Sequence, residues 1–212
     1  MGIFSNDFKP ICVGDLILGN KYKFIIPSFQ RGYRWDEKQV IDLLEDIKRF
    51  SCTNNQGYIY YLQPLIVCKG NGNNEWIVLD GQQRLTTLKL IILNLMPYKG
   101  KKIADKILNN IYEIEYQSRK SIDFNTPHKD LDINNYYVYN SNEIIKKWIN
   151  NIENTSNGTI IFEGMLNCLI SETPYDNQEL LNNVKFVKFI WYEINSMYWC
   201  TKSRHSNWGT IQ

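Results

Sequence analysis

The sequence predicts an α+β fold, in which a small mixed α/β core is followed by a mostly helical region. Before residue 81, short segments with the apolar pattern of strands are interleaved with segments of helical spacing. After Tyr98, helical spacing dominates. The chain has 212 residues, of which 43% are hydrophobic, and this is enough for one good-sized core or for a small core with a helical extension.

The first predicted elements surround a loop that is rich in arginine and aromatic residues. Residues 8–19 predict a short amphipathic opening, and "YKFIIP" (22–27) predicts a strand that a proline ends. "SFQRGYRW" (28–35) predicts the loop, and Asp36 then begins a helix by forming a capping box with Gln39. The apolar face of this helix consists of Val40, Leu43, Leu44 and Ile47.

A hairpin is predicted over residues 58–80. "YIYYLQPLIVCK" (58–69) predicts a strand that is broken or bulged at Pro64. "GNGNN" (70–74) has the composition of a turn, and "EWIVLD" (75–80) predicts the returning strand.

Helices dominate the rest of the prediction. The helix after Gly81 ends before Pro97, because proline cannot continue it. Its apolar stripe consists of Leu85, Leu88, Ile92 and Leu95. Further helices are predicted over residues 101–110, 142–153 and 159–171, and "VKFVKFIWYEI" (184–194) predicts a strand. We therefore divide the chain into a core at 1–98, a helical extension that ends in a strand at 99–194, and an irregular tail at 195–212.

Composition limits the classes of function. Lys and Arg nearly balance Asp and Glu, and a net charge of +2 does not indicate a global electrostatic grip on nucleic acid, although it allows a local basic patch. The five cysteines are scattered without the spacing of metal ligands, which indicates reduced thiols in a cytoplasmic protein and no zinc site. We find no signal peptide, and the apolar run "LIILNLM" is too short to span a bilayer, so we expect no membrane association.

The segment "DGQQR" (80–84) joins a predicted strand directly to a predicted helix. The first turn of a helix leaves backbone N–H groups without intrahelical partners, and the helix dipole adds partial positive charge there. Gly81 lets the chain turn tightly, so that the N–H groups of Gln82, Gln83 and Arg84 point toward one spot. The Arg84 guanidinium adds a fork that suits phosphate oxygens, and the segment therefore fits an anion site.

Asp80 has the wrong charge for direct contact with phosphate. It is better suited to hold a cation such as Mg²⁺, which would bridge to phosphate, or to orient a water. The residues alone leave another interpretation open. In it, Asp80 is an ordinary N-cap, Gln82 and Gln83 form a solvated first turn, and Arg84 is a surface ion-pair partner.

Gln30, Arg31 and Arg34 alternate with aromatic residues in the predicted loop. Arginines beside aromatic rings can pair with a phosphate and help to stack a base, which is typical of sites for nucleotides or nucleic acid. The alternative is a loop that anchors itself in the core and leaves its arginines in solvent. The anchoring side chains would then be Phe29, Tyr33 and Trp35.

Three stretches of the sequence resemble the N-terminal domain of GmrSD-type modification-dependent restriction enzymes. They are "IPSFQRGYRWDEKQVIDLLEDI", "YYLQPLIV" and "WIVLDGQQRLTTLKLIILNL". The specific feature is the pattern I-P-x-F-Q-R-x-Y-x-W followed further along the chain by D-G-Q-Q-R-L-T-T. A weaker likeness continues through "VKFIWYEI" (187–194), so the resemblance covers almost the whole chain up to residue 194.

The resemblance implies a core similar to the ParB/sulfiredoxin fold, which binds nucleotide phosphates at a helix N-terminus. It also implies hydrolysis of a nucleoside triphosphate in bacterial defence against phage DNA. The D-G-Q-Q-R motif is tied to this hydrolysis, and the Q-R pair, here Gln30 and Arg31, belongs to the same pocket. We therefore expect Asp80 and Arg84 to be catalytic and Mg²⁺ to be the cofactor. The expected phosphate-binding residues are Gln30, Arg31, Arg34, Gly81, Gln82, Gln83 and Arg84.

The sequence departs from the family pattern after residue 194. Family members usually continue into a segment with an F-x-x-L-N-x-G-like motif, and many end in an H-N-H-type nuclease domain, whereas the only histidines here are His128 and His205. We expect a C-terminally truncated member that does not cleave DNA on its own and whose further partners are DNA or a nuclease-bearing chain. The alternatives are a non-enzymatic ParB-like nucleic-acid-binding module and an inactive remnant.

Overall fold

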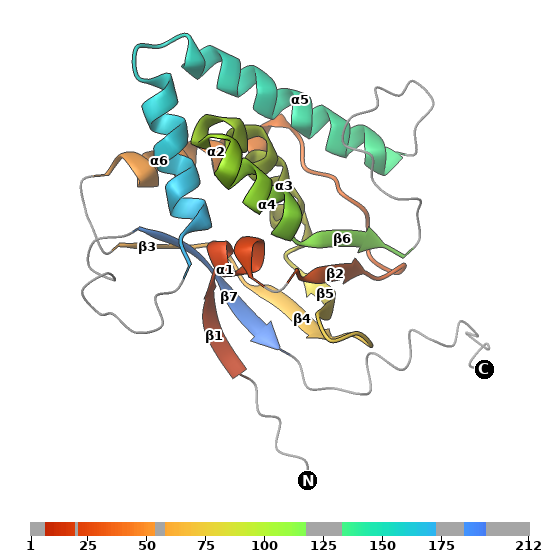
Figure 1. The fold of residues 1–212 in the computed structure, drawn as a ribbon. Coiled ribbons are helices and arrows are strands. Elements are labelled where there is room, and N and C mark those ends of the chain that lie inside the picture. The colour runs from red at the N-terminus through yellow and green to blue at the C-terminus, as the bar shows by residue number, and fades with distance from the viewer. Residues whose placement is uncertain (1–6, 20, 54–57, 118–132, 173–184, 194–212) are drawn as a thin grey trace, which may run out of the picture.

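The computed structural model describes residues 7–19, 21–53, 58–117, 133–172 and 185–193. Seven strands form one mixed sheet with helices on one face, so the predicted mixed α/β class is confirmed (Figure 1). The strands are β1 (Asp7–Cys12), β2 (Lys23–Ile26), β3 (Ile59–Tyr61), β4 (Leu65–Lys69), β5 (Glu75–Asp80), β6 (Glu113–Tyr116) and β7 (Phe186–Glu193). The helices are α1 (Val13–Leu18), α2 (Glu37–Cys52), α3 (Gln82–Leu95), α4 (Lys101–Asn110), α5 (Ile133–Glu153) and α6 (Gly158–Ile170), and the 3-10 helix η1 (Met96–Lys99) follows α3. The tail predicted at 195–212 lies outside the described residues.

The topology of the sheet brings two distant loops together. The strand order is β1-β7-β4-β5-β2-β6, and β5 is parallel to β2. Since parallel neighbours end at the same edge of a sheet, the loop after β2 and the turn after β5 lie side by side. These two connections contain the segments 28–35 and 80–84.

The predicted break at Pro64 is confirmed, and so is the part of the hairpin after it, but the part before Pro64 does not belong to the hairpin. β4 and β5 pair antiparallel, but β3 pairs parallel with the first residues of β7. Pro64 lies between β3 and β4, where a residue without an N–H cannot continue a ladder. The chain therefore leaves one strand at Pro64 and begins another, and β4 also pairs with β7.

Strands from both sides of residue 98 share the sheet. β7 lies between β1 and β4, and β6 pairs with β2 at the far edge. The division of the chain at residue 98 stays a prediction, but the sheet that carries the 80–84 turn includes strands from later in the chain.

Several local predictions for the helices are confirmed. Asp36 and Gln39 form the capping box of α2, and the four predicted core residues of this helix are buried. Helix α3 ends at Leu95, before Pro97, and α4 has the predicted bounds.

Two helices differ from their predictions because tertiary packing decides their extent. The side chains of α3 are buried around most of its circumference, and not only along the predicted stripe, because α5 and α6 pack against it. Helix α5 begins at Ile133, well before residue 142, although its first turns are rich in asparagine and tyrosine. The buried Val138 and Ser141 in this part show that packing stabilises it beyond its propensity.

A cluster of aromatic rings joins β7 to residues in and beside β2 and β5. Trp191 is only 2% exposed, and its ring lies 4.8 Å from that of Trp76, measured between centroids. The rings of Tyr22 and Phe24 lie 6.2 and 6.3 Å from it. This cluster packs β7 against Tyr22 and against side chains from β2 and β5.

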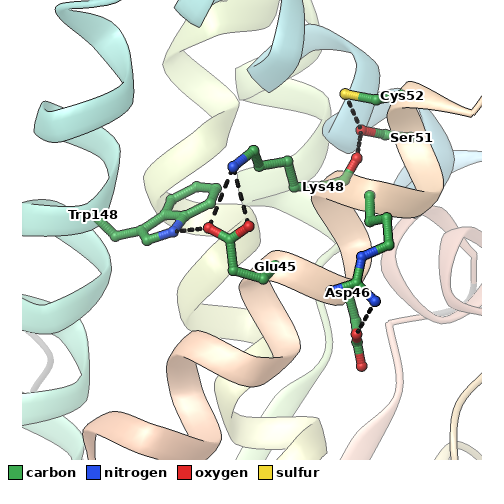
Figure 2. A network of polar contacts seen from close by, with 7 residues as sticks. Glu45, Asp46, Lys48, Ser51, Cys52 and Trp148 are labelled. Atoms are coloured by element: carbon green, nitrogen blue, oxygen red, sulfur yellow. Dashed lines mark hydrogen bonds and ion pairs between the residues drawn. The ribbon is translucent and has the colours of Figure 1, made fainter.

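A polar contact joins α2 to α5 (Figure 2). Trp148 Nε1 donates a hydrogen bond to Glu45 Oε1 at 2.8 Å, and Lys48 Nζ lies 3.0 Å from Glu45 Oε2. Burial works against the charged form of Glu45, but the hydrogen bonds from Trp148 and Lys48 outweigh it and lower the pKa of this carboxyl. None of the described helices is long and apolar enough to cross a membrane.

The aromatic cluster predicts a large loss of stability when its central ring is removed. Trp191→Ala should lower the free energy of unfolding by about 3–5 kcal/mol, because it leaves a cavity among rings that cannot fully collapse. Ile160→Ala, at a side chain that is 70% exposed, should change it by less than about 0.5 kcal/mol. Urea denaturation followed by circular dichroism measures both values, and equal stabilities of the two variants would contradict the role of the cluster.

Candidate functional site

A β-bulge at the end of β5 changes the direction of the strand just before the turn. Ile66 of β4 pairs with Asp80 and Val67 pairs with Val78, so Leu79 is the extra residue. Gln30 Nε2 donates to the carbonyl oxygens of Val78 and Leu79 at 3.0 and 2.8 Å. Bulges often occur beside functional sites, where they bend a strand and redirect a side chain. Here the side-chain amide of Gln30 binds the carbonyl groups at the bulge.

Gly81 has the left-handed backbone that the tight turn requires. Its φ is +95°, and it is the N-cap of α3 without a side-chain hydrogen bond. A Cβ at this position would lie 3.0 Å from Leu65 Cδ1 and 3.1 Å from the Pro64 carbonyl oxygen. Both the backbone angle and the available space therefore select glycine.

The glutamines of the motif bind the 28–35 loop. Gln83 Nε2 donates to the Gly32 carbonyl oxygen at 3.0 Å, and Gln83 Oε1 accepts from the Arg34 N–H at 2.8 Å. Gln82 Nε2 donates to the Arg31 carbonyl oxygen at 2.8 Å. The two glutamines are 8% and 7% exposed, so the interpretation as a solvated first turn is wrong.

One end of the Gln82 amide has no partner in the described part of the chain. Because the Arg31 carbonyl can only accept, the bond to it fixes the nitrogen, and Oε1 is then buried without a hydrogen bond. A buried acceptor without a donor costs about 1–3 kcal/mol. A water or a donor on a ligand would remove this cost.

Arg84, unlike its buried neighbours in α3, is only half-buried, and it borders a cavity of about 430 Å³. Its guanidinium lies 5.9 Å from the ring centroid of Trp35 and donates to Gln63 Oε1. Partial burial lowers the pKa of Arg84, while the charge of Asp80 and the nearby Tyr60 oppose this shift. A bound anion would therefore replace hydration that this guanidinium has partly lost. We call this space the α2–β3 cavity, and its lining is Trp35, Gln39, Asp42, Leu43, Asp46, Tyr60, Tyr61, Leu62, Gln63 and Arg84.

Asp80 is exposed at the last position of β5 and does not cap α3. The interpretation of Asp80 as an ordinary N-cap is therefore wrong. Its charge acts on Arg84, which places the two groups close enough for an electrostatic interaction.

The two loop arginines have different surroundings. Arg31 is exposed, while its carbonyl group binds Gln82 beside the first turn of α3. Arg34 Nη1 donates to the Tyr33 carbonyl oxygen, and its guanidinium lies 5.3 Å from the ring centroid of Tyr137 in α5. Tyr33 itself is buried and shares a 2.7 Å hydrogen bond with Thr87 of α3, so this part of the loop is anchored in the core.

All the residues that the sequence predicts for the site therefore gather at one junction, but their contacts differ. The three glutamines hold protein backbone, whereas Asp80, Arg31 and Arg84 keep charged groups at or near the surface. Sequence reasoning missed the cavity. The signal for part of it was the helical spacing of Gln39, Asp42 and Asp46, which places them on one face of α2.

The fold and the site define a mixed α/β protein in which a left-handed glycine leads from a strand into a buried helix, beside a cavity lined by arginine, carboxylate and aromatic side chains. Among known families, the sequence matches the one described as GmrSD restriction endonuclease, N-terminal domain, over residues 13–205, and the chain belongs to this family. The match confirms the resemblance and extends past residue 194 into the segment set apart as a tail. No curated protein matches the chain.

The double hydrogen bond of Gln83 predicts a large structural effect. Gln83→Ala should lower the free energy of unfolding by about 2–3 kcal/mol, because the Gly32 carbonyl and the Arg34 N–H both lose their partner. Gln117→Ala, at an exposed glutamine, is the matched control and should have almost no effect. Thermal and urea unfolding measure the difference. A Gln83→Ala protein as stable as the control would show that the 28–35 loop does not depend on this bond.

Proposed function

We propose that this chain binds a nucleoside triphosphate at the start of α3 and hydrolyses it with the help of Mg²⁺. The observation that carries the proposal is the combination of the left-handed Gly81 with a partly desolvated Arg84 in the same turn. Helix starts of this kind bind phosphate through backbone N–H groups and the helix dipole. Membership of a restriction-system family agrees with a nucleotide-dependent role.

The phosphate-binding groups are the backbone N–H groups of the first turn and the guanidinium of Arg84. Leu85 N bonds to the Gly81 carbonyl oxygen, so the N–H groups of residues 82–84 precede the first intrahelical bond. Arg31 lies beside this turn through its backbone and supplies a second, exposed guanidinium. The amides of Gln30, Gln82 and Gln83 act indirectly, by holding the loop and the turn together.

Asp80 is the group that we assign to Mg²⁺. In the described residues, no three His, Cys, Asp or Glu side chains gather as a metal site. One exposed carboxylate fits Mg²⁺, which usually binds one or two carboxylates together with substrate phosphates and waters. When bound, the ion neutralises charge that develops on the phosphate oxygens. The charge of Asp80 also favours the charged form of the Arg84 guanidinium and opposes the effect of burial on its pKa.

The 28–35 loop supports a second candidate function, which is contact with nucleic acid. Phe29 is 64% exposed beside the exposed Arg31, and an aromatic ring next to an arginine can stack a base while the arginine pairs with a phosphate. DNA, or a chain that carries a nuclease, would then be a partner of the same junction. Salt-dependent binding of single-stranded DNA that Phe29→Ala weakens, without any change in nucleotide affinity, is the result expected for this function.

The role of Arg84 predicts a loss of nucleotide affinity. Arg84→Ala should weaken binding of a nucleoside triphosphate by about 1.5–3 kcal/mol, the range for hydrogen bonds to charged groups. Arg84→Lys should restore only part of this, because an ammonium group lacks the planar fork. Lys102→Ala, at an exposed cation on α4, controls for the change in net charge. Calorimetric titration measures the affinities of the wild type and the three variants, and an Arg84→Ala protein that folds and binds like the wild type would refute the role.

The role of Asp80 predicts a separation of binding from hydrolysis. Asp80→Asn keeps the size of the side chain but removes its charge. It should abolish Mg²⁺-dependent phosphate release while leaving nucleotide affinity similar, or slightly higher without metal, because a negative charge near the phosphates has gone. The melting temperature should not change, since Asp80 does not cap α3. Phosphate release from each triphosphate measures the effect, and equal rates in the two proteins would refute the role of Asp80 in hydrolysis.

A further inference from the structure

The charges around the α2–β3 cavity are unevenly arranged. Among the described residues of its lining, Arg84 is the one cation, whereas Asp42 and Asp46 contribute two carboxylates from one face of α2. Carboxylates repel phosphate, so phosphate groups are favoured beside Arg84 and disfavoured beside α2. If a nucleotide enters this cavity, the part that lies against α2 must be one that donates hydrogen bonds.

Of the two carboxylates, Asp46 is the one that a hydrogen bond from the cavity wall orients. Tyr60 donates its hydroxyl proton to Asp46 Oδ2 at 3.0 Å, and Arg49 Nη1 lies 3.8 Å from Oδ1. Burial, together with this hydrogen bond, raises the pKa of Tyr60 to about 12, so the hydroxyl remains a donor at neutral pH. Figure 2 shows Asp46 pointing away from the Glu45–Trp148 contact between α2 and α5. Since a carboxylate has about four acceptor positions, Asp46 can accept further hydrogen bonds from a ligand.

The cavity also offers aromatic surface and has a suitable size. Trp35 and Tyr60 are partly buried in its wall, and Tyr61 is 51% exposed. Aromatic rings stack on nucleobases with little dependence on the identity of the base. A volume of about 430 Å³ lies within the range of small-molecule pockets.

We propose that the α2–β3 cavity binds the base of the nucleotide and that Asp46 selects guanine. Guanine presents its N1–H and an N2–H side by side, and this pair matches the two oxygens of a carboxylate. Uracil presents one N–H between two carbonyl oxygens, which the carboxylate repels. Adenine and cytosine each offer one amino group on this edge, so we expect their affinities to lie between those of guanine and uracil. The proposal rests on the proposed function, because the phosphates at Arg84 determine which end of the nucleotide enters the cavity.

The test compares four triphosphates and one ligand without a base. Affinities for guanosine, adenosine, cytidine and uridine triphosphate and for inorganic triphosphate are measured by calorimetry with the whole chain. Guanosine triphosphate should bind at least about tenfold more tightly than uridine triphosphate, the lower limit for a hydrogen bond to a charged group. Asp46→Asn, which can still accept from Tyr60, should reduce this ratio to below about threefold, since a neutral amide oxygen forms the weaker bond. Asp105→Asn, at an exposed carboxylate on α4, should leave the ratio unchanged.

A second variant separates stacking from base selection. Tyr61→Ala should lower the affinity for all four nucleotides by a similar factor and leave the affinity for inorganic triphosphate unchanged. Inorganic triphosphate that binds as tightly as guanosine triphosphate, or a preference that persists in Asp46→Asn, would overturn the assignment of the base while leaving the proposed function intact. Failure of all five ligands to bind would overturn the proposed function, and the base assignment with it.

Discussion

Five hydrogen bonds between three glutamine side chains and backbone groups hold the 28–35 loop against the turn between β5 and α3, and the rest of the site depends on them. Gln30 binds the bulge from the loop, while Gln82 and Gln83 bind the loop from the helix. An amide suits this joint because it carries both a donor and an acceptor without a charge. A carboxylate or an ammonium group in the same buried position would have to be desolvated and paired.

The residues of the 80–84 segment therefore have two different roles. The amides satisfy backbone groups that the bulge and the loop would otherwise leave unpaired, and the charged neighbours Asp80 and Arg84 are thereby oriented outward. Loss of activity after substitution of a motif residue therefore has two physical causes. A glutamine variant changes the shape of the junction, whereas an arginine or aspartate variant changes its charge. Measurements of stability beside affinity distinguish them, because the glutamine amides hold the loop and the bulge through their backbone groups.

The sequence predicted best what local chemistry decides. The capping box of α2, the end of α3 before Pro97 and the bounds of α4 follow from residues close to each other in the chain, and the family was identified from two motifs. What it did not predict depends on distant partners. The parallel pairing of β3 with β7, the bulge at Leu79 and the early start of α5 are set by tertiary contacts. The sequence also did not show that the side chains of Gln82 and Gln83 hold the 28–35 loop, because polarity in a sequence does not show whether a side chain meets water or backbone.

The place of β7 in the sheet has a consequence for the order in which the chain acquires its structure. This strand is made late, yet it inserts between β1, which is made first, and β4. During synthesis on the ribosome, β1 and the edge of β4 that pairs with β7 remain without this partner until almost the whole described chain has been made. Contacts of such long sequence separation slow folding and leave strand edges exposed in the meantime. The nascent protein is therefore most vulnerable to misassociation just before β7 emerges, and a chaperone that shields strand edges would act at that stage.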